Sequence, residues 1–227
     1  MNENLGVGAG EAKNGGEVVE AGNFRFEKLE IPGLVVITPK VFPDERGYFL
    51  ETYSEKDFAK AGIDCKFVQD NQSGSTFGVL RGLHFQKEHP QAKLVRATFG
   101  QVFDVAVDLR EGSPTFGKWH GVLLTDENKK QFFIPKGFAH GFVVLSGKAE
   151  FTYKCDDFYA PGDEGGLIWN DPEVGIEWPI EGFLEADGSE NASVAQVEKL
   201  KKEDIILSEK DQKHPGLSEV FRFKGLI

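Results

Sequence analysis

Short runs of hydrophobic residues, broken by turn residues, recur along most of the chain. Several runs alternate apolar and polar positions, which is typical of β-strands because successive side chains point to opposite faces. Many short strands at regular spacing predict an all-β fold, a double sheet of the jelly-roll type that closes into a barrel. We expect ordered structure from 24–31 onward, with strands at 33–42 (buried), 46–53, 66–71, 78–86, 93–99, 101–109, 115–125, 131–135, 137–146, 148–155, 166–172 and 176–179.

Helical signals are few. Ser54 followed by Asp57 begins a short helix that should end at Gly62, and Ser193 followed by Gln196 is a capping-box signal for a helix over about 193–204. The segment 1–23 is rich in Gly, Glu, Asn and Ala and has no large aromatic residue, so we expect a disordered tail. Residues 24–227 then form one domain, with an acidic stretch at 180–192 that has no strand pattern.

Polar residues interrupt three neighbouring apolar strands. Arg81 and His84 lie inside the apolar run 78–86, Lys93 opens the next run, and Asp104 and Asp108 share one face of 101–109. Buried polar groups without partners are costly, so these side chains need partners or a ligand. The pattern therefore predicts a polar-lined cavity between strands rather than a purely apolar core.

Composition narrows the possible partners. The 227-residue chain has a net charge of −11, which argues against nucleic acid and anionic membranes but leaves room for a small anion beside local arginines. The N-terminal residues lack a basic start and an apolar run, so we expect no signal peptide, and because no run of about 20 apolar residues occurs we expect no membrane span. Only Cys65 and Cys155 occur, which favours a reducing compartment, the cytoplasm, and two ordinary buried thiols.

Several motifs occur in a fixed order: FPDERGYFLE (42–51), FVQDNQS (67–73), LRGLHFQ (80–86), PQAKLVR (90–96), FDVAVDLR (103–110), SPTFGKW (113–119), IPKGFAHGF (134–142), FTYKCDDFY (151–159), EGG (164–166), WNDP (169–172) and LSEKD (207–211). Through them the chain resembles the dTDP-4-dehydrorhamnose 3,5-epimerases, which are cupin-type barrels. The segments 1–23 and 180–206 lie outside this resemblance.

The resemblance implies inversion of sugar carbons next to a ketone. That reaction needs a base, a group that holds the enolate oxygen and an acid on the opposite face. It implies His84 as base, Asp211 as the partner that orients it, Lys93 as the cation at the oxyanion and Tyr153 as acid. Without the resemblance, His84, Lys93 and Tyr153 would read as a core histidine, a surface lysine and a core tyrosine. Strand geometry also makes Asp104 a possible second neighbour of His84, with a paired inner carboxylate as the alternative.

The resemblance also implies a set of substrate-binding residues. Arg46 and Glu51 reach the site from a neighbouring subunit in this family, so a homodimer is expected. Arginine guanidinium groups such as those of Arg46 and Arg81 match diphosphate oxygens, and Tyr159 is expected to form a wall for the nucleotide. The full set is Arg46, Glu51, Gln69, Asn71, Arg81, His140, Tyr159, Glu164 and Lys210; for each of them a structural salt bridge or a surface position is the alternative.

We expect no metal and no cofactor. The segment 135–140 resembles the cupin motif P-x-G-x-x-H, but the H-x-H half of a cupin metal site reads His84–Phe85–Gln86 here and lacks its second imidazole. His89, His120 and His214 give no ligand spacing.

Three alternatives to a 3,5-epimerase remain at this level. They are an epimerase that inverts one centre of a related dTDP-keto sugar, a sugar-binding or structural cupin without catalysis, and a metal-dependent cupin enzyme. The combination of base, cation and acid argues against a purely binding protein.

Overall fold

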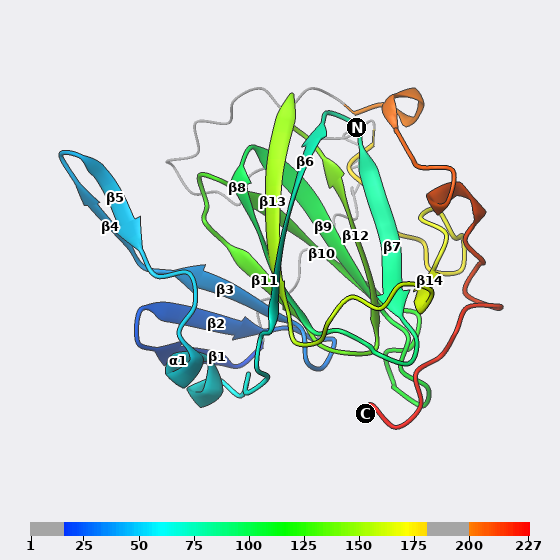
Figure 1. Cartoon of the computed structure of the whole chain (residues 1–227), viewed down its shortest axis with the longest axis horizontal. Helices are drawn as coiled ribbons and strands as arrows, with labels where there is room; N and C mark the ends of the chain where they lie inside the picture. Colours follow the sequence, from blue (N-terminus) through cyan, green and yellow to red (C-terminus); the bar gives the residue numbers. More distant parts are fainter. Residues whose placement is uncertain (1–15, 181–199) are drawn as a thin grey trace, which may run out of the picture.

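The computed structural model describes residues 16–180 and 200–227. Two antiparallel β-sheets pack face to face as a jelly roll, and one hairpin projects from them (Figure 1). The seven-stranded sheet has the order β1 (Val18–Ala21), β2 (Phe24–Lys28), β3 (Val35–Pro39), β11 (Gln131–Ile134), β8 (Lys93–Phe99), β13 (Lys148–Cys155) and β6 (Gln69–Thr76).

The five-stranded sheet carries the central segment of the chain. Its order is β10 (Trp119–Thr125), β9 (Gln101–Asp108), β12 (Phe138–Val144), β7 (Leu80–Gln86) and β14 (Glu164–Gly166). The projecting hairpin pairs β4 (Val41–Asp44) with β5 (Gly47–Leu50). The helical pieces are α1 (Glu55–Lys60) and the 3-10 turns η1 (Lys202–Asp204) and η2 (Asp211–Lys213).

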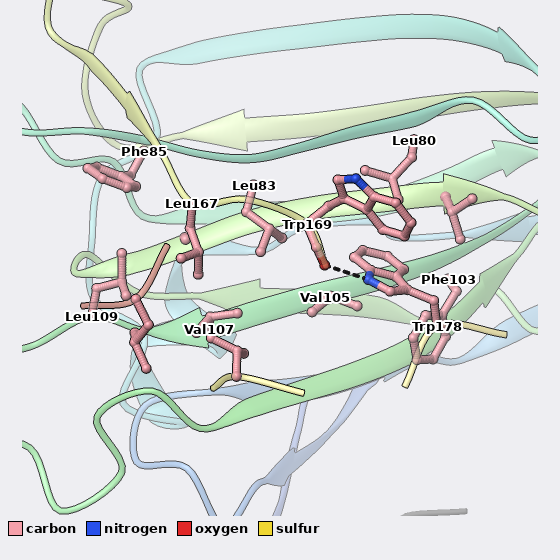
Figure 2. Packing of buried hydrophobic residues seen from close by; sticks show 14 of the residues in the cluster. Leu80, Leu83, Phe85, Phe103, Val105, Val107, Leu109, Leu167, Trp169 and Trp178 are labelled. Atoms are coloured by element: carbon pink, nitrogen blue, oxygen red, sulfur yellow. Dashed lines mark hydrogen bonds between the residues drawn. The ribbon is translucent and has the colours of Figure 1, made fainter. Parts of the chain in front are cut away.

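The five-stranded sheet is covered on both faces. Between the two sheets, Phe132 and Val95 of one sheet pack against Phe142 and Val102 of the other. The opposite face carries Leu83, Val105 and Val107, which pack under residues that follow β14 and under the C-terminal segment. Figure 2 shows this second cluster, in which Trp178 Nε1 donates a 2.8 Å hydrogen bond to the Trp169 carbonyl oxygen. All seven residues of β12 are buried, as a central strand covered on both faces requires.

A close backbone approach joins β7 to β12. A Cβ atom on Gly141 would lie 2.6 Å from the Arg81 carbonyl oxygen, and one on Gly82 would lie 2.6 Å from Gly141 Cα. Gly82 also has φ +126°, in the region that L side chains rarely adopt. The glycines therefore let the two strands that carry His84 and His140 lie directly opposite each other.

Several strand predictions are confirmed. The run 148–155 matches β13 at both ends, and the runs at 78–86, 93–99, 101–109, 115–125, 131–135 and 137–146 each contain the strand that was expected. The predicted helix is present as α1, which packs Phe58 against Phe24 and Phe26.

Other predictions are wrong in part. Residues 18–21 pair with β2 instead of belonging to a tail, because Ala21 packs into the cluster under α1. The run 33–42 splits into β3 and the exposed β4, and the run 46–53 yields only β5. The strand expected at 66–71 begins at Gln69 and continues to Thr76. Of the strand expected at 166–172 only Gly166, the last residue of β14, is strand, and the rest of that run and 176–179 are turns and coil.

The remaining end predictions fall mostly outside the described residues. This holds for residues 1–15 of the expected tail and for 193–199 of the expected helix. Residues 200–204, which are described, contain the single turn η1. Among the described residues, no helix has the length and apolar character needed to cross a bilayer.

Candidate active site

A cavity of about 480 Å³ opens between the two sheets, on the side where β7 and β12 face β8, β13 and β6. Seven of the thirteen site residues predicted from the sequence line it. They are Arg81, His84, Lys93, His140, Tyr153, Lys210 and Asp211.

His84 and Asp211 form a close pair in this cavity. His84 comes from β7, and the C-terminal segment that carries Asp211 is tied to the start of β7 by Leu80 N donating to Ile206 O at 3.0 Å and Ile206 N donating to Gly78 O at 2.9 Å. His84 Nε2 lies 2.6 Å from Asp211 Oδ1. Burial of Asp211 raises its pKa, but the hydrogen bond and charge of His84 outweigh burial, so the net pKa is lowered. An ionised Asp211 only accepts, which makes His84 Nε2 the donor.

Lys93 and Tyr153 come from the neighbouring strands β8 and β13. The register pairs Lys93 with Cys155 and Val95 with Tyr153. The side chains of Lys93 and Tyr153 therefore point to the same face of the sheet, with Tyr153 offset from Lys93 by two residues along the strands. Lys93 Nζ lies 5.9 Å from the centroid of the Tyr153 ring. Burial lowers the pKa of Lys93, and Cys155, Asp104 and Glu164 partly oppose that effect. Burial also raises the pKa of Tyr153, which favours its protonated phenol.

A second histidine–carboxylate pair lies next to the first. His140 of β12 is directly opposite His84 in the strand register, and its Nε2 lies 2.9 Å from Asp104 Oδ2. The interpretation of Asp104 as a neighbour of His84 is therefore wrong, because β12 separates β9 from β7 and brings His140 in between. Burial raises the pKa of Asp104 and lowers that of His140, so burial favours the uncharged form of each partner.

Asp108 does not reach the cavity, although it shares a face of β9 with Asp104. Its carboxylate accepts hydrogen bonds from Arg110 Nη2, Ser113 Oγ and Thr115 Oγ1, each at 2.7 Å, at the turn that follows β9. The sequence pattern correctly puts Asp108 on the same face of β9 as Asp104, but Asp108 lies at the end of the strand that is away from the cavity.

The rim of the cavity carries further predicted binding residues. Lys210 forms an ion pair with Glu164 of β14, and the hydrogen bond from Lys210 lowers the pKa of Glu164. Arg81 is exposed and donates from Nε to Ser75 Oγ at 3.0 Å. These groups leave one guanidinium and one ammonium close to bulk water at the cavity mouth.

Gln69, Asn71 and Tyr159 form a separate polar group at the end of β6. Tyr159 N donates to Gln69 Oε1 at 3.0 Å, and Gln69 Nε2 donates to Asn71 Oδ1 at 3.1 Å. The Tyr159 side chain lies past the end of β13, as expected, and is 52% exposed. Asn71 lines a second hollow that shares Tyr153 with the first but has no histidine in its lining.

Arg46 and Glu51 are not brought to the cavity within one chain. Arg46 lies at the turn of the projecting hairpin, where its Nη2 pairs with Asp44 and its side chain is 85% exposed. Glu51 accepts a 2.8 Å hydrogen bond from Asn23 Nδ2.

His214 is a residue that the sequence analysis missed. Its Nε2 lies 3.5 Å from Asp211 Oδ1, and its ring meets the His84 ring edge-on at a centroid distance of 5.5 Å. Sequence spacing does not indicate His214 and His84 as ligands of one site, because 129 residues separate the two, and only the fold brings His84, Asp211 and His214 together. Gln86, by contrast, uses its amide to hold the carbonyl oxygens of His89 and Phe158 at 2.7 and 3.2 Å.

Known proteins of one family resemble this chain. The family profile described as dTDP-4-dehydrorhamnose 3,5-epimerase matches residues 28–219. A protein of that name from Pseudomonas aeruginosa is 58% identical over 155 residues, which cover 68% of this chain and 86% of the relative.

Solved structures agree with this assignment. A dTDP-6-deoxy-D-glucose-3,5-epimerase from Legionella pneumophila, in complex with dTDP-4-keto-L-rhamnose, has a TM-score of 0.75 and 45% identity and covers 87% of this chain and 95% of its own. A 3′-monoepimerase from Streptomyces bikiniensis, in complex with dTDP-quinovose, has a TM-score of 0.70 and 31% identity, with coverages of 84% and 86%. The profile, the relatives and the jelly-roll fold agree, and the chain belongs to the dTDP-4-dehydrorhamnose 3,5-epimerase family.

Proposed function

We propose that this chain inverts C3 and C5 of dTDP-4-dehydro-6-deoxy-D-glucose and so makes dTDP-4-dehydro-L-rhamnose. The observation that carries the proposal is the convergence of the His84–Asp211 pair, Lys93 and Tyr153 on one cavity. The family membership supports the substrate class, because relatives of that name are 48% and 58% identical over the aligned residues.

His84 acts as the base in this proposal. Its Nε2–H group donates a hydrogen bond to Asp211, so its Nδ1 carries a free lone pair. This lone pair accepts a proton from the carbon next to the C4 ketone. The imidazolium that forms is then stabilised by the ionised carboxylate of Asp211. The electron pair left on carbon moves into the carbonyl and gives an enolate.

Lys93 stabilises the enolate oxygen, and Tyr153 returns a proton to the other face. A cation placed where negative charge develops contributes about 3–4 kcal/mol, by analogy with a donor in an oxyanion hole. Burial lowers the pKa of Lys93, and an enolate formed beside it opposes that effect by favouring the charged ammonium. The phenol of Tyr153 stays protonated near neutral pH and is available as the acid.

The remaining predicted residues bind the sugar and nucleotide parts of the substrate in this proposal. Arg81 and Lys210 supply cations at the mouth for the diphosphate, and His140, held by Asp104, donates or accepts hydrogen bonds to the sugar. Gln69, Asn71, Tyr159 and Glu164 line the approach for the nucleoside.

A homodimer is part of the proposal. The β4–β5 hairpin exposes Tyr48 at 59% and Phe49 at 67%, an unusual amount for large aromatic side chains in a monomer. It stands away from the two sheets and carries Arg46 at its turn (Figure 1). A partner subunit that receives this hairpin gains Arg46 and Glu51 for its own substrate site.

We place the enzyme in the cytoplasm, without a nucleic-acid or membrane partner and without a cofactor. Both cysteines are free thiols, which fits a reducing compartment, and the net charge of −11 disfavours polyanionic surfaces. Proton transfer next to a ketone needs neither a redox group nor a metal.

A single-centre epimerase is the second candidate, because a 3′-monoepimerase is among the structural relatives at 31% identity. The test is turnover of dTDP-4-dehydro-6-deoxy-D-glucose by the purified chain, with the ring configuration of the product read from proton NMR couplings. We expect inversion at both carbons. Inversion at one carbon would support the second candidate, and an unchanged sugar would contradict both.

A further inference from the structure

Three metal-binding side chains meet at the inner edge of the cavity. His84, Asp211 and His214 each offer one ligand atom, and the three atoms all lie within 4.8 Å of one another. His84 Nε2 and His214 Nε2 lie 2.6 and 3.5 Å from the same atom, Asp211 Oδ1. No step of the proposed reaction uses His214.

His214 is placed as a ligand rather than as an ordinary core residue. Its side chain is 9% exposed, and its Nε2 is the one fully buried side-chain nitrogen or oxygen without a hydrogen-bond partner in residues 16–180 and 200–227. Gly166 makes room for it, because a Cβ atom there would overlap the imidazole ring. A buried nitrogen that makes no hydrogen bond is costly, and a metal ion would satisfy it.

We propose that these three residues bind a Zn²⁺-class ion that blocks the epimerase base. Two imidazoles and one carboxylate are a typical donor set for zinc. Zn²⁺ bonds of about 2.0–2.1 Å at tetrahedral angles place ligand atoms about 3.3 Å apart. The Asp211–His214 distance of 3.5 Å already fits, and the His84–Asp211 pair at 2.6 Å has to open by less than 1 Å, a change on the order of a side-chain adjustment.

The cavity gives an ion access to this site. His84 is 35% exposed in its side chain, and His84 and Asp211 both line the cavity. Lys210, which precedes Asp211 in the chain, is paired with Glu164 and so is partly neutralised. Water takes the fourth position of a three-ligand zinc site.

Binding of the ion would stop proton abstraction, and this consequence rests on the proposed function. An imidazole that binds Zn²⁺ through Nε2 carries its proton on Nδ1, so neither nitrogen keeps a free lone pair. The ion also replaces the hydrogen bond by which Asp211 orients the base. The site shares His84 with the usual cupin metal position but takes Asp211 and His214 as its other ligands, whereas the cupin-motif His140 is held by Asp104.

The test is calorimetric titration of the full chain with ZnCl₂ after treatment with a chelator, together with visible absorption of Co²⁺ as a report on tetrahedral coordination. We expect one ion per chain. His214→Gln should weaken binding by more than about tenfold, and His84→Asn, which alters a more exposed ligand, should do the same. His89→Gln is the matched control, because His89 is 61% exposed and lies outside the cluster. Thermal unfolding of each variant checks that it is folded.

Absence of stoichiometric binding, or binding that survives both ligand substitutions, would overturn the inference. Turnover of the sugar is also measured at increasing ZnCl₂ concentration. Zn²⁺ should inhibit the wild type and His89→Gln at lower concentrations than it inhibits His214→Gln. Equal inhibition of all three would also overturn it. If the chain binds Zn²⁺ as described but does not turn over the sugar, the proposed function fails and the metal site stands.

Discussion

The proposed reaction depends on four side chains, His84, Lys93, Tyr153 and Asp211, and each can be tested by itself. We expect His84→Ala to lower kcat by at least about a hundredfold, since a positioned general base contributes 10²–10⁴. We expect Lys93→Ala to cost about 3–4 kcal/mol of transition-state stabilisation, by analogy with loss of an oxyanion donor. The measurement is kcat of each variant compared with kcat of the wild type and of the control His89→Ala. An unchanged kcat in His84→Ala or Lys93→Ala would exclude that residue from the mechanism.

Tyr153→Phe separates proton removal from inversion. The variant keeps His84 and Lys93, so it should still exchange the hydrogen next to the ketone with solvent. It lacks the proposed donor on the opposite face, so formation of the inverted product should fall by at least about tenfold, within the range for a general acid. The comparison of deuterium uptake with product formation in one sample measures both. Equal loss of exchange and inversion would show that Tyr153 has another role.

At this scale the sequence predicted residue types better than residue pairs. The motifs identified His84, Lys93, Tyr153 and Asp211, which the fold brings to one cavity. They did not reveal that Asp104 pairs with His140, because that contact depends on β9 and β12 becoming neighbours. They also did not reveal that the His214 ring meets the His84 ring, because that contact depends on the C-terminal segment packing beside β7. Arg46 pairs with Asp44 on the projecting hairpin and does not line the cavity, so its role at the site of a partner subunit stays a prediction.

Among the elements, the turn after β9 holds the end of the five-stranded sheet. The carboxylate of Asp108 accepts hydrogen bonds from Arg110, Ser113 and Thr115, and it is fully buried with the Arg110 side chain 9% exposed. Removing one member of such a buried pair costs about 3–5 kcal/mol. We expect Asp108→Asn to lower the free energy of unfolding by that amount at pH 7, as measured by urea denaturation.

The same carboxylate gives a pH dependence. Burial raises the pKa of Asp108, but its hydrogen bonds outweigh burial, so the folded-state pKa lies below the ordinary value of 3.8. Its stabilising contribution is therefore present above pH 3.8 and is lost as the pH falls through the folded-state pKa. The difference in unfolding free energy between wild type and Asp108→Asn should shrink on moving from pH 7 to below pH 3.8. A difference that stays constant or grows would contradict this assignment.

The sequence predicts the central strands well and the flanking elements poorly. Runs such as 148–155 alternate clearly and lie in the middle of a sheet, so local pattern and tertiary position agree. Val41 and Phe42 read as part of a buried strand, but they lie on an exposed hairpin. In the run 166–172, Gly166 ends β14 and Leu167 still exchanges two backbone hydrogen bonds with Leu83. The apolar residues after Leu167 pack on the outer face of the sheet outside any strand, because hydrophobic burial does not by itself require ladder hydrogen bonds.

For the whole molecule, the question is whether the projecting β4–β5 hairpin completes the active site of a partner subunit. Exchange of subunits between two inactive variants tests this. If Arg46 serves the site of the partner, Arg46→Ala and His84→Ala should each be nearly inactive alone. After mixing and exchange of subunits, half of the dimers contain one of each, and one of their two sites is intact, so about a quarter of wild-type activity should return. No recovery, under conditions where native mass spectrometry shows mixed dimers, would mean that Arg46 acts within its own chain or not at all.

The central claim is that one imidazole and one cation in a cavity between two sheets remove protons from both carbons that flank a ketone. The most direct measurement is incubation of the chain with dTDP-4-dehydro-6-deoxy-D-glucose in D₂O, with NMR used to count deuterium at C3 and C5. We expect label at both carbons with the wild type and at neither with His84→Ala. Absence of label with the wild type, or full labelling with His84→Ala, would contradict it.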